Sequence, residues 1–151
     1  MRVVIQRVSE ASVTIDEVLK SAIRHGLLLL AGFETDDTDE DLDWMCKKIT
    51  QLRIFDDEQG VMNRSVKEID GEILVVSQFT LYAKTKKGNR PSYINAAPPE
   101  ISIPLYNMFV EILGSLIGKE IQTGEFGAMM MVELINDGPV TIIIDSKNKD
   151  L

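Results

Sequence analysis

The chain has 151 residues, of which 44% are hydrophobic and 26% charged, so it is long enough for one domain with a sizeable buried core. Its 16 basic and 24 acidic residues give a formal net charge of −8, which argues against nucleic-acid binding over the whole surface, because phosphate contacts need clustered Lys and Arg. No apolar run reaches the roughly 18 residues of a membrane span, and the single cysteine excludes an internal disulfide.

Strand patterns dominate the start of the chain. Polar and apolar residues alternate from the N-terminus, and shorter apolar patterns follow, so the predicted strands span 2–9, 13–15, 18–23 and 27–33. The polar pair Asp16-Glu17 marks a turn between the second and third of them. The first strand begins at once, without the apolar region and cleavage site of a signal peptide, so we expect a cytoplasmic protein.

A helix is predicted to begin at Thr38, a residue type that caps helices well. The three acidic residues that follow suit the positive end of a helix dipole. The next apolar positions recur with the helical period and should face the core: Leu42, Met45, Cys46, Ile49 and Leu52. We interpret Cys46 as a buried thiol rather than a nucleophile or a metal ligand.

The second half of the chain predicts more strands, a second helix and a final hairpin. Pro98, Pro99 and Pro104 indicate a loop before the helix. The buried face of that helix would comprise Leu105, Phe109, Ile112, Leu113 and Leu116. The elements predicted after residue 52 are a strand at 53–55, a turn at 56–60, a strand at 71–81, the helix ending at Gly118, and strands at 129–135 and 140–144 joined by a turn at 136–139.

This order of elements predicts a sheet-rich α/β fold as a single domain over residues 1–151. We expect a mixed, barrel-like β-sheet with two main covering helices. Two helices cover only part of so much sheet, so the sheet should curl into a barrel-like form or find a partner. A homodimer is therefore expected.

Residues that commonly carry catalysis are scarce in this chain. The one histidine, His25, stands beside Gly26 in a turn, and the one cysteine is not at a metal-ligand spacing from it. No phosphate-binding or dinucleotide-binding glycine pattern occurs. We therefore expect no metal and no cofactor, and any chemistry should rely on hydroxyl groups and the backbone.

One such group of residues stands at the end of the strand predicted at 71–81. Ser77, Gln78, Phe79 and Thr80 place hydroxyl and amide groups directly after a buried apolar run. In a regular strand Gln78 and Thr80 would share one face. Backbone amides of Phe79 and Thr80 could donate to a developing oxyanion, which would suffice for an already activated ester. The alternative is a core strand that ends with a local capping bond.

A basic loop follows this segment. It carries four cations and no anion, namely Lys84, Lys86, Lys87 and Arg90. In an acidic chain, such a patch suits a phosphate-bearing partner touched at one end only. The alternative is a surface loop that is simply solvated.

A second distinctive segment is Asn136-Asp137-Gly138-Pro139-Val140-Thr141, between two apolar runs. A cis bond before proline costs only about 0.5–1 kcal/mol, and tertiary contacts can fix it. With either isomer the proline removes a backbone donor and leaves carbonyls free, so the Gly138-Pro139 pair could act as a rigid steric wedge. An ordinary hairpin turn remains the alternative.

Taken together, these segments resemble the D-aminoacyl-tRNA deacylase family. The matching segments occur in the family's order along essentially the whole chain: MRVVIQRVS (1–9), LRIF (52–55), GEILVVSQFTLY (71–82), KGNRPS (87–92), APPE (97–100), TGEFGA (123–128) and NDGPVT (136–141). The pairing of SQFTL with NDGPVT is the most specific part of the match.

The resemblance implies a homodimer with two sites at the subunit interface. Gly138-Pro139 would be cis and would enter the partner's pocket, braced by Arg7, to exclude the side chain of an L-amino acid. Met130 and the segment 77–80 would line that pocket. Thr80 would position the substrate rather than act as a nucleophile, with the 2′-hydroxyl of the terminal adenosine assisting. Met129 stands where many members carry Asp, which bears on substrate breadth.

The implied activity is hydrolysis of the ester of D-aminoacyl-tRNA, and also of mischarged glycyl-tRNA, to free amino acid and tRNA. The expected partners are the 3′ acceptor end of aminoacyl-tRNA, held through the basic loop, and a second copy of the chain, with no membrane and no DNA. The alternative function is a non-catalytic, nucleic-acid-associated dimer that uses the Lys84–Arg90 loop.

Overall fold

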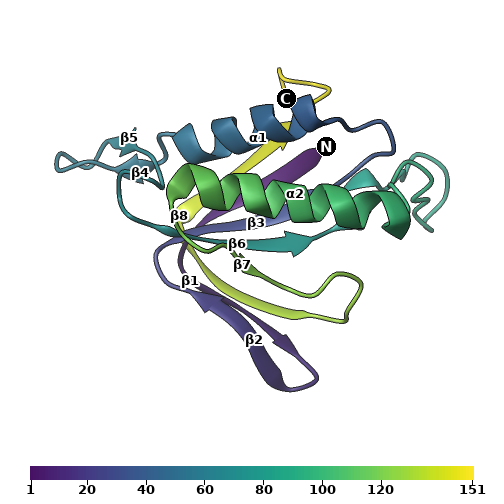
Figure 1. Ribbon diagram of the computed structural model, residues 1–151, viewed down its shortest axis with the longest axis horizontal. Helices are drawn as coiled ribbons and strands as arrows, with labels where there is room; N and C mark the ends of the chain where they lie inside the picture. The colour runs from purple at the N-terminus through teal and green to yellow at the C-terminus, as the bar shows by residue number, and fades with distance from the viewer.

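A mixed six-stranded sheet organises the computed structural model, which describes all residues from 1 to 151 (Figure 1). Its strands are β1 (Arg2–Ile15), β2 (Val18–Ile23), β3 (Gly26–Gly32), β6 (Glu72–Ser77), β7 (Gln122–Thr123) and β8 (Met131–Asp145). They lie in the order β2-β1-β3-β6-β7, with β8 paired to β1. β3, β6 and β7 run parallel, whereas β1 is antiparallel to β2, β3 and β8.

The sheet curls until its two edges meet. The Ser21 hydroxyl of β2 donates to the Thr123 carbonyl of β7 at 2.7 Å, so the barrel is nearly closed. Two helices, α1 (Asp39–Gln51) and α2 (Pro99–Ile117), cover one face of the sheet (Figure 1). The predicted single domain, with a barrel-like mixed sheet and two covering helices, is confirmed.

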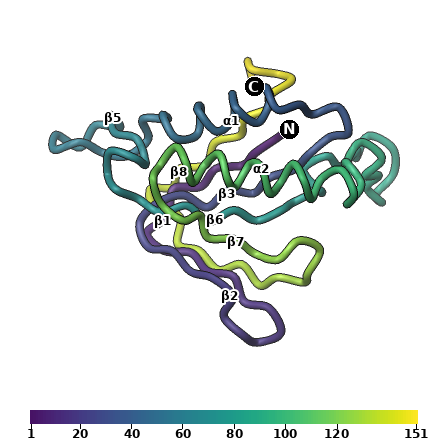
Figure 2. Tube along the Cα trace, in the orientation of Figure 1, coloured from purple at the N-terminus to yellow at the C-terminus, as the bar shows by residue number.

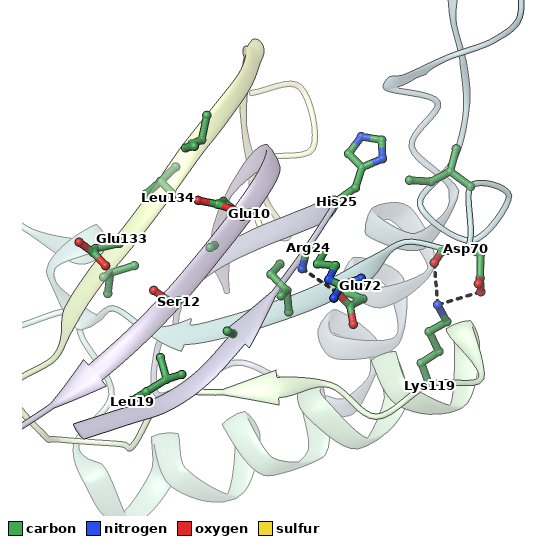
Figure 3. A pocket seen from close by; sticks show the side chains of 16 residues that line it. Glu10, Ser12, Leu19, Arg24, His25, Asp70, Glu72, Lys119, Glu133 and Leu134 are labelled. Carbon is green, nitrogen blue, oxygen red and sulfur yellow. Dashed lines mark hydrogen bonds and ion pairs between the residues drawn. The ribbon is translucent and has the colours of Figure 1, made fainter. Parts of the chain in front are cut away.

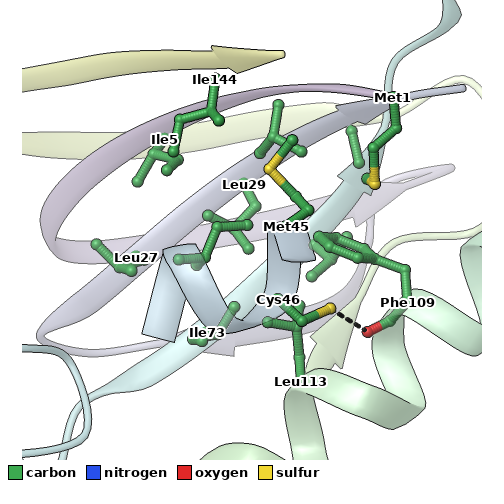
Figure 4. Close-up of a cluster of buried hydrophobic side chains, with 14 of the residues drawn as sticks. Met1, Ile5, Leu27, Leu29, Met45, Cys46, Ile73, Phe109, Leu113 and Ile144 are labelled. Carbon is green, nitrogen blue, oxygen red and sulfur yellow. Dashed lines mark hydrogen bonds between the residues drawn. The ribbon is translucent and has the colours of Figure 1, made fainter. Parts of the chain in front are cut away.

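Apolar clusters occupy both faces of the sheet. β3 explains why, because its sequence is apolar at consecutive positions and successive side chains point to opposite faces. Leu27 and Leu29 pack under the helices with Met45 and Phe109 (Figure 4). Leu28 points the other way, into a smaller cluster inside the curled half of the sheet.

β1 is one continuous strand, so the prediction of separate strands at 2–9 and 13–15 is wrong. The strand changes neighbours along its length: residues 2–8 pair with β3, and residues 11–15 pair with β2. Ser9 and Glu10 are exposed at the change, and their polarity interrupts the apolar alternation that the prediction used. The two chain ends meet beside this strand, where the Ser146 amide donates to the Met1 carbonyl at 2.9 Å (Figure 2).

β8 is also continuous, so the predicted closing hairpin is wrong. Both of its halves pair with β1, and the register moves from Gln6 opposite Thr141 to Val8 opposite Asn136. Four residues of β8 therefore stand opposite the single residue Arg7. Asp137–Val140 form a bulge within one long strand, because turn-forming residues such as Gly138 and Pro139 serve a bulge as well as a hairpin.

α1 begins as predicted. The Thr38 hydroxyl accepts from the Asp41 amide at 3.4 Å, and the Asp41 carboxylate accepts from the Thr38 amide at 2.9 Å, which completes a capping box. Cys46 is fully buried on the inner face of this helix. Burial, with a smaller effect from Asp43, raises the pKa of its thiol to about 12, so Cys46 is a core residue.

α2 begins at Pro99, earlier than predicted, and Pro104 lies inside it rather than in a preceding loop. Pro99 suits the first helical turn, where its missing N–H costs nothing. Pro104 is exposed, so water can reach the carbonyl that lacks its donor. Gly118 ends the helix with a positive φ of 70°, as predicted.

By length and composition alone, α2 could span a membrane. Its Tyr106, Phe109 and Leu113 side chains are buried against the sheet and α1. The core helix of a globular domain can be equally long and apolar, so the length and composition of α2 do not indicate a membrane span.

A small hairpin projects beside the helices. It comprises β4 (Phe55–Asp56) and β5 (Met62–Arg64), which form a separate two-stranded sheet. The predicted turn at 56–60 connects them. The Asp57 carboxylate fixes that turn by accepting from the amides of Gln59 and Val61 at 2.9 and 3.0 Å.

Candidate functional site

The Ser77–Thr80 segment leaves the sheet where β6 ends. The Gln78 amide makes a last bond to the Ala31 carbonyl at 2.7 Å, and the chain then forms the 3₁₀ turn η1 (Phe79–Tyr82). The strand predicted to continue to residue 81 is therefore wrong, because β3 ends at Gly32 and leaves no neighbour for further pairing. The Gln78 side-chain amide donates to the Thr80 hydroxyl.

This turn leaves two backbone amides without a partner. The first bond of η1 runs from the Leu81 amide to the Gln78 carbonyl at 3.3 Å. The amides of Phe79 and Thr80 precede it, so the turn itself supplies no carbonyl to either of them. Both are free to bind an oxygen atom of a ligand.

A cavity of about 760 Å³ lies against this turn, and we call it the Ser77–Thr80 cavity. Its opposite wall comes from the loop between β7 and β8 and from the segment before α2. The residues around it include Ser77, Gln78, Phe79, Thr80, Tyr93, Ala96, Phe126, Met129 and Met130. The structure thus brings together five predicted site residues, namely the segment 77–80 and Met130.

The cavity is mostly apolar, and none of its residues is an Asp, Glu, Lys, Arg or His. No side chain around it can act as an efficient general base, and no usual set of metal ligands is present. The cavity offers a polar substrate only hydroxyl groups, one side-chain amide and the two free backbone amides.

Aromatic residues form the rim of the cavity. The Phe79 and Tyr93 rings meet edge to face, with centroids 5.0 Å apart, and both rings are exposed. Tyr93 and Phe126 were not predicted as site residues. Both lie in or next to segments that match the family, and this position in the sequence could have indicated that they belong to the site. Their residue type alone, an aromatic ring, indicated only packing in the core.

The Gly138-Pro139 pair lies outside this cavity, exposed on β8, and its peptide bond is cis. The Arg7 guanidinium donates to the carbonyls of Asp137 at 2.9 Å and Ile54 at 2.7 Å. The Asn136 side chain accepts from the Val140 amide at 2.8 Å. The segment is therefore held from both sides.

Glycine is required at position 138. Its φ is +136°, which L side chains rarely adopt. An added Cβ would also lie 2.9 Å from the Val140 side chain and 3.0 Å from the Arg7 guanidinium.

The basic loop extends from the end of η1. A backbone pair between Lys84 and Ser92, at 2.8 and 3.1 Å, closes it. The four predicted cations, Lys84, Lys86, Lys87 and Arg90, are exposed, and none forms an ion pair. The loop offers positive charge to solvent beside the cavity.

A larger hollow of about 1250 Å³ lies elsewhere, over β1, β2 and β8 (Figure 3). Charged pairs line its edge, including Lys119 with Asp70 at 2.8 Å. It contains none of the predicted site residues.

Comparison with known proteins decides the family. A family profile described as "D-Tyr-tRNA(Tyr) deacylase" matches residues 4–145. A D-aminoacyl-tRNA deacylase of Bacteroides fragilis (strain YCH46) is 68% identical over 150 residues, covering 99% of this chain and 100% of that protein. The chain belongs to the D-aminoacyl-tRNA deacylase family. A relative with that name from Flavobacterium psychrophilum is 65% identical over the same length.

Two solved structures are similar to this one along nearly their whole length. Both structures share the fold of this chain. One, named "c-Myc DNA Unwinding Element Binding Protein", superposes with a TM-score of 0.91 at 44% identity, covering 96% of this chain and 98% of that chain. The other, a probable eukaryotic D-amino acid tRNA deacylase, has a TM-score of 0.82 over 95% of this chain and 97% of its own. At 18% identity the second match shows the fold alone. The family and the fold are as predicted, whereas the dimer remains a prediction.

Proposed function

We propose that this protein hydrolyses the ester bond of D-aminoacyl-tRNA and releases a D-amino acid and tRNA. The observation that carries the proposal is the pair of free amides at Phe79 and Thr80, in a cavity without an acid or a base, in a member of this family. Such a site suits an ester that is already activated.

The proposed chemistry relies on the backbone and on the substrate. Water attacks the ester carbonyl, and the amides of Phe79 and Thr80 donate to the oxyanion that forms. The 3′ oxygen of the ribose then leaves with a proton, and the neighbouring 2′-hydroxyl assists this transfer. Thr80 positions the ester, because no base lies beside its hydroxyl.

We further propose that each cavity is completed by a second copy of the chain. Met131 stands opposite Thr14 and the bulge of β8 stands opposite Arg7, seven residues away on β1, so Met130 and Pro139 are separated by roughly 20–25 Å at about 3.3 Å per residue. One chain therefore cannot put Pro139 against its own cavity. A two-fold axis near Leu134 would bring each Gly138-Pro139 pair to the other copy's cavity.

The surface of β8 supports such a contact. β8 pairs only with β1, so its other edge is free to meet a partner. The apolar side chains of Met129, Met131 and Ile135 are 86%, 68% and 55% exposed. Contact with a second copy would remove this apolar surface from water.

In this arrangement, substrates are selected by exclusion. The rigid Gly138-Pro139 pair clashes with the side chain of an L-amino acid, whereas a D side chain points away. A clash discriminates more sharply than an added apolar contact. Glycine has no side chain to reject, so mischarged glycyl-tRNA is also a substrate in our proposal.

The basic loop is proposed to hold the phosphates near the acceptor end of the tRNA. Its four free cations lie beside the cavity in a chain with a net charge of −8. Phosphate contacts position a nucleic acid without reading the attached amino acid. Because aminoacyl-tRNA is used in the cytoplasm, we expect the protein there.

A turnover assay tests the proposed activity. Enzyme at one hundredth of the substrate concentration should release most of the D-amino acid from D-aminoacyl-tRNA and leave the matched L-aminoacyl-tRNA intact. Release of no more than one equivalent per enzyme would contradict the proposal.

A second candidate is a non-catalytic nucleic-acid-binding dimer. It is favoured by the exposed basic loop and by the name of the solved relative at 44% identity. Such a protein would shift the mobility of an oligonucleotide without releasing amino acid, so the same assay separates the two functions.

A further inference from the structure

The Gly138-Pro139 segment has a second anchor besides Arg7. Arg7 holds the carbonyl of Asp137, the residue before Gly138. The Asp137 carboxylate lies between two other groups. Its Oδ2 is 3.6 Å from His25 Nε2 and 3.4 Å from Arg7 Nε.

His25 is fixed by the turn that carries it. The His25 carbonyl accepts from the Glu72 amide at 3.2 Å, and the Glu72 carboxylate accepts from the Arg24 amide at 2.6 Å (Figure 3). A Cβ on Gly26 would lie 1.9 Å from the Glu72 carbonyl oxygen, so the turn fits against β6 only with glycine there. The imidazole also packs edge to face on Phe55, with centroids 5.2 Å apart.

The segment that His25 faces has little backbone support of its own. Four residues of β8 bulge opposite Arg7, and Asp137 is 42% exposed. Side chains must therefore fix the position of Gly138 and Pro139. A fixed imidazole beside Asp137 restrains the bulge on the side that Arg7 leaves open.

We propose that His25 is a positioning residue for the Gly138-Pro139 pair, acting through Asp137, and that it sharpens the rejection of L-aminoacyl-tRNA. The inference rests on the proposed function, because it concerns the selectivity of the same site. His25 touches no reacting atom in this proposal, so the rate on D-aminoacyl-tRNA does not depend on it.

The test compares the wild type with His25→Gln, Asp137→Asn and the double variant. Arg64→Gln is the matched control, because Arg64 lines a small cavity of about 340 Å³ together with His25 and Asp137 but donates to the Glu68 carbonyl at 2.6 Å instead. A contact between two half-exposed polar side chains is worth about a two- to five-fold effect. Hydrolysis of L-aminoacyl-tRNA should rise by about that factor in either single variant, and no further in the double variant.

Hydrolysis of D-aminoacyl-tRNA should be unchanged in all of these variants. After subtraction of hydrolysis in buffer alone, the L-to-D ratio of His25→Gln should exceed that of the wild type. The Gly138 amide resonance gives a readout independent of activity. It should differ between the wild type and His25→Gln, and not between the wild type and Arg64→Gln.

A His25→Gln protein that matches the wild type in both the L-to-D ratio and the Gly138 resonance would overturn the inference. Equal loss of D and L hydrolysis would also overturn it, because the role would then be structural. If the wild type hydrolyses neither substrate, the proposed function fails, and the resonance comparison alone decides whether His25 positions Gly138.

Discussion

Thr80 positions the ester in the proposed mechanism, whereas in nucleophilic catalysis its hydroxyl would attack the ester. In the side-chain network its hydroxyl bonds only to Gln78, and the cavity offers no base. Thr80→Ala should therefore keep its rate on D-aminoacyl-tRNA within about ten-fold, whereas loss of a nucleophile costs several orders of magnitude. Single-turnover rates check this, and a trapped aminoacyl-Thr80 ester would contradict it.

The Phe79 amide is expected to matter more than the Thr80 hydroxyl. Phe79→Pro removes this N–H at a position where the helical φ suits proline. Loss of one oxyanion donor costs about 10²- to 10³-fold in rate. Phe79→Ala is the control, because it removes the ring and keeps the amide. Equal rates for the two variants would exclude the amide from the reaction.

At the scale of elements, the turn between β1 and β2 carries backbone strain. Asp16 and Glu17 form a two-residue turn with φ values of 48° and 64°, a conformation in which glycine is preferred. Glu17→Gly should therefore stabilise the fold by about 0.5–1 kcal/mol, or about 1–4 °C in melting temperature. Calorimetry checks this against Glu17→Ala, which keeps the strain. A lower melting temperature for Glu17→Gly would contradict it.

Elements set by local chemistry were predictable from the sequence. Thr38 with Asp41 fixes the start of α1, and Gly118 fixes the end of α2, because caps depend on neighbours a few residues away. The continuity of β1 was not predictable, since its change from β3 to β2 depends on strands that are distant in sequence.

The candidate site was predictable in part. Ser77–Thr80 were predicted as site residues because hydroxyl and amide groups follow a buried apolar run and because the segment resembles the family. Their turn was not found, because Phe79-Thr80-Leu81-Tyr82 has strand-forming composition and leaves the sheet only where no neighbouring strand remains. The anchoring contact of His25 with Asp137 joins residues 112 positions apart, and no local pattern indicates it.

At the scale of the whole molecule, charge is uneven. The basic loop is the proposed tRNA contact in an otherwise acidic chain. Lys86→Gln with Lys87→Gln should raise KM, weaken its dependence on salt and leave the D-over-L preference intact. Neutralising Lys47 and Lys48, which are exposed on α1, is the control. If the loop variant keeps its KM and its salt dependence, the tRNA approaches by another face.

The central claim is that the cavity of one subunit is completed by Gly138-Pro139 of the other. Mixed dimers test it, because the cavity and the Gly-Pro pair can be damaged in different chains. A Pro139→Ala chain keeps an intact cavity and should hydrolyse both L-aminoacyl-tRNA and D-aminoacyl-tRNA. A Phe79→Pro chain keeps an intact Gly-Pro pair and should be nearly inactive.

The decisive measurement is L-aminoacyl-tRNA hydrolysis by Pro139→Ala chains assembled with an excess of Phe79→Pro chains. In the mixed dimer, the working cavity faces an intact Gly-Pro pair from its partner. The account predicts that L hydrolysis falls to the wild-type level while D hydrolysis continues. Unchanged L hydrolysis in verified mixed dimers, or a protein that sediments as a monomer at assay concentrations, would contradict it.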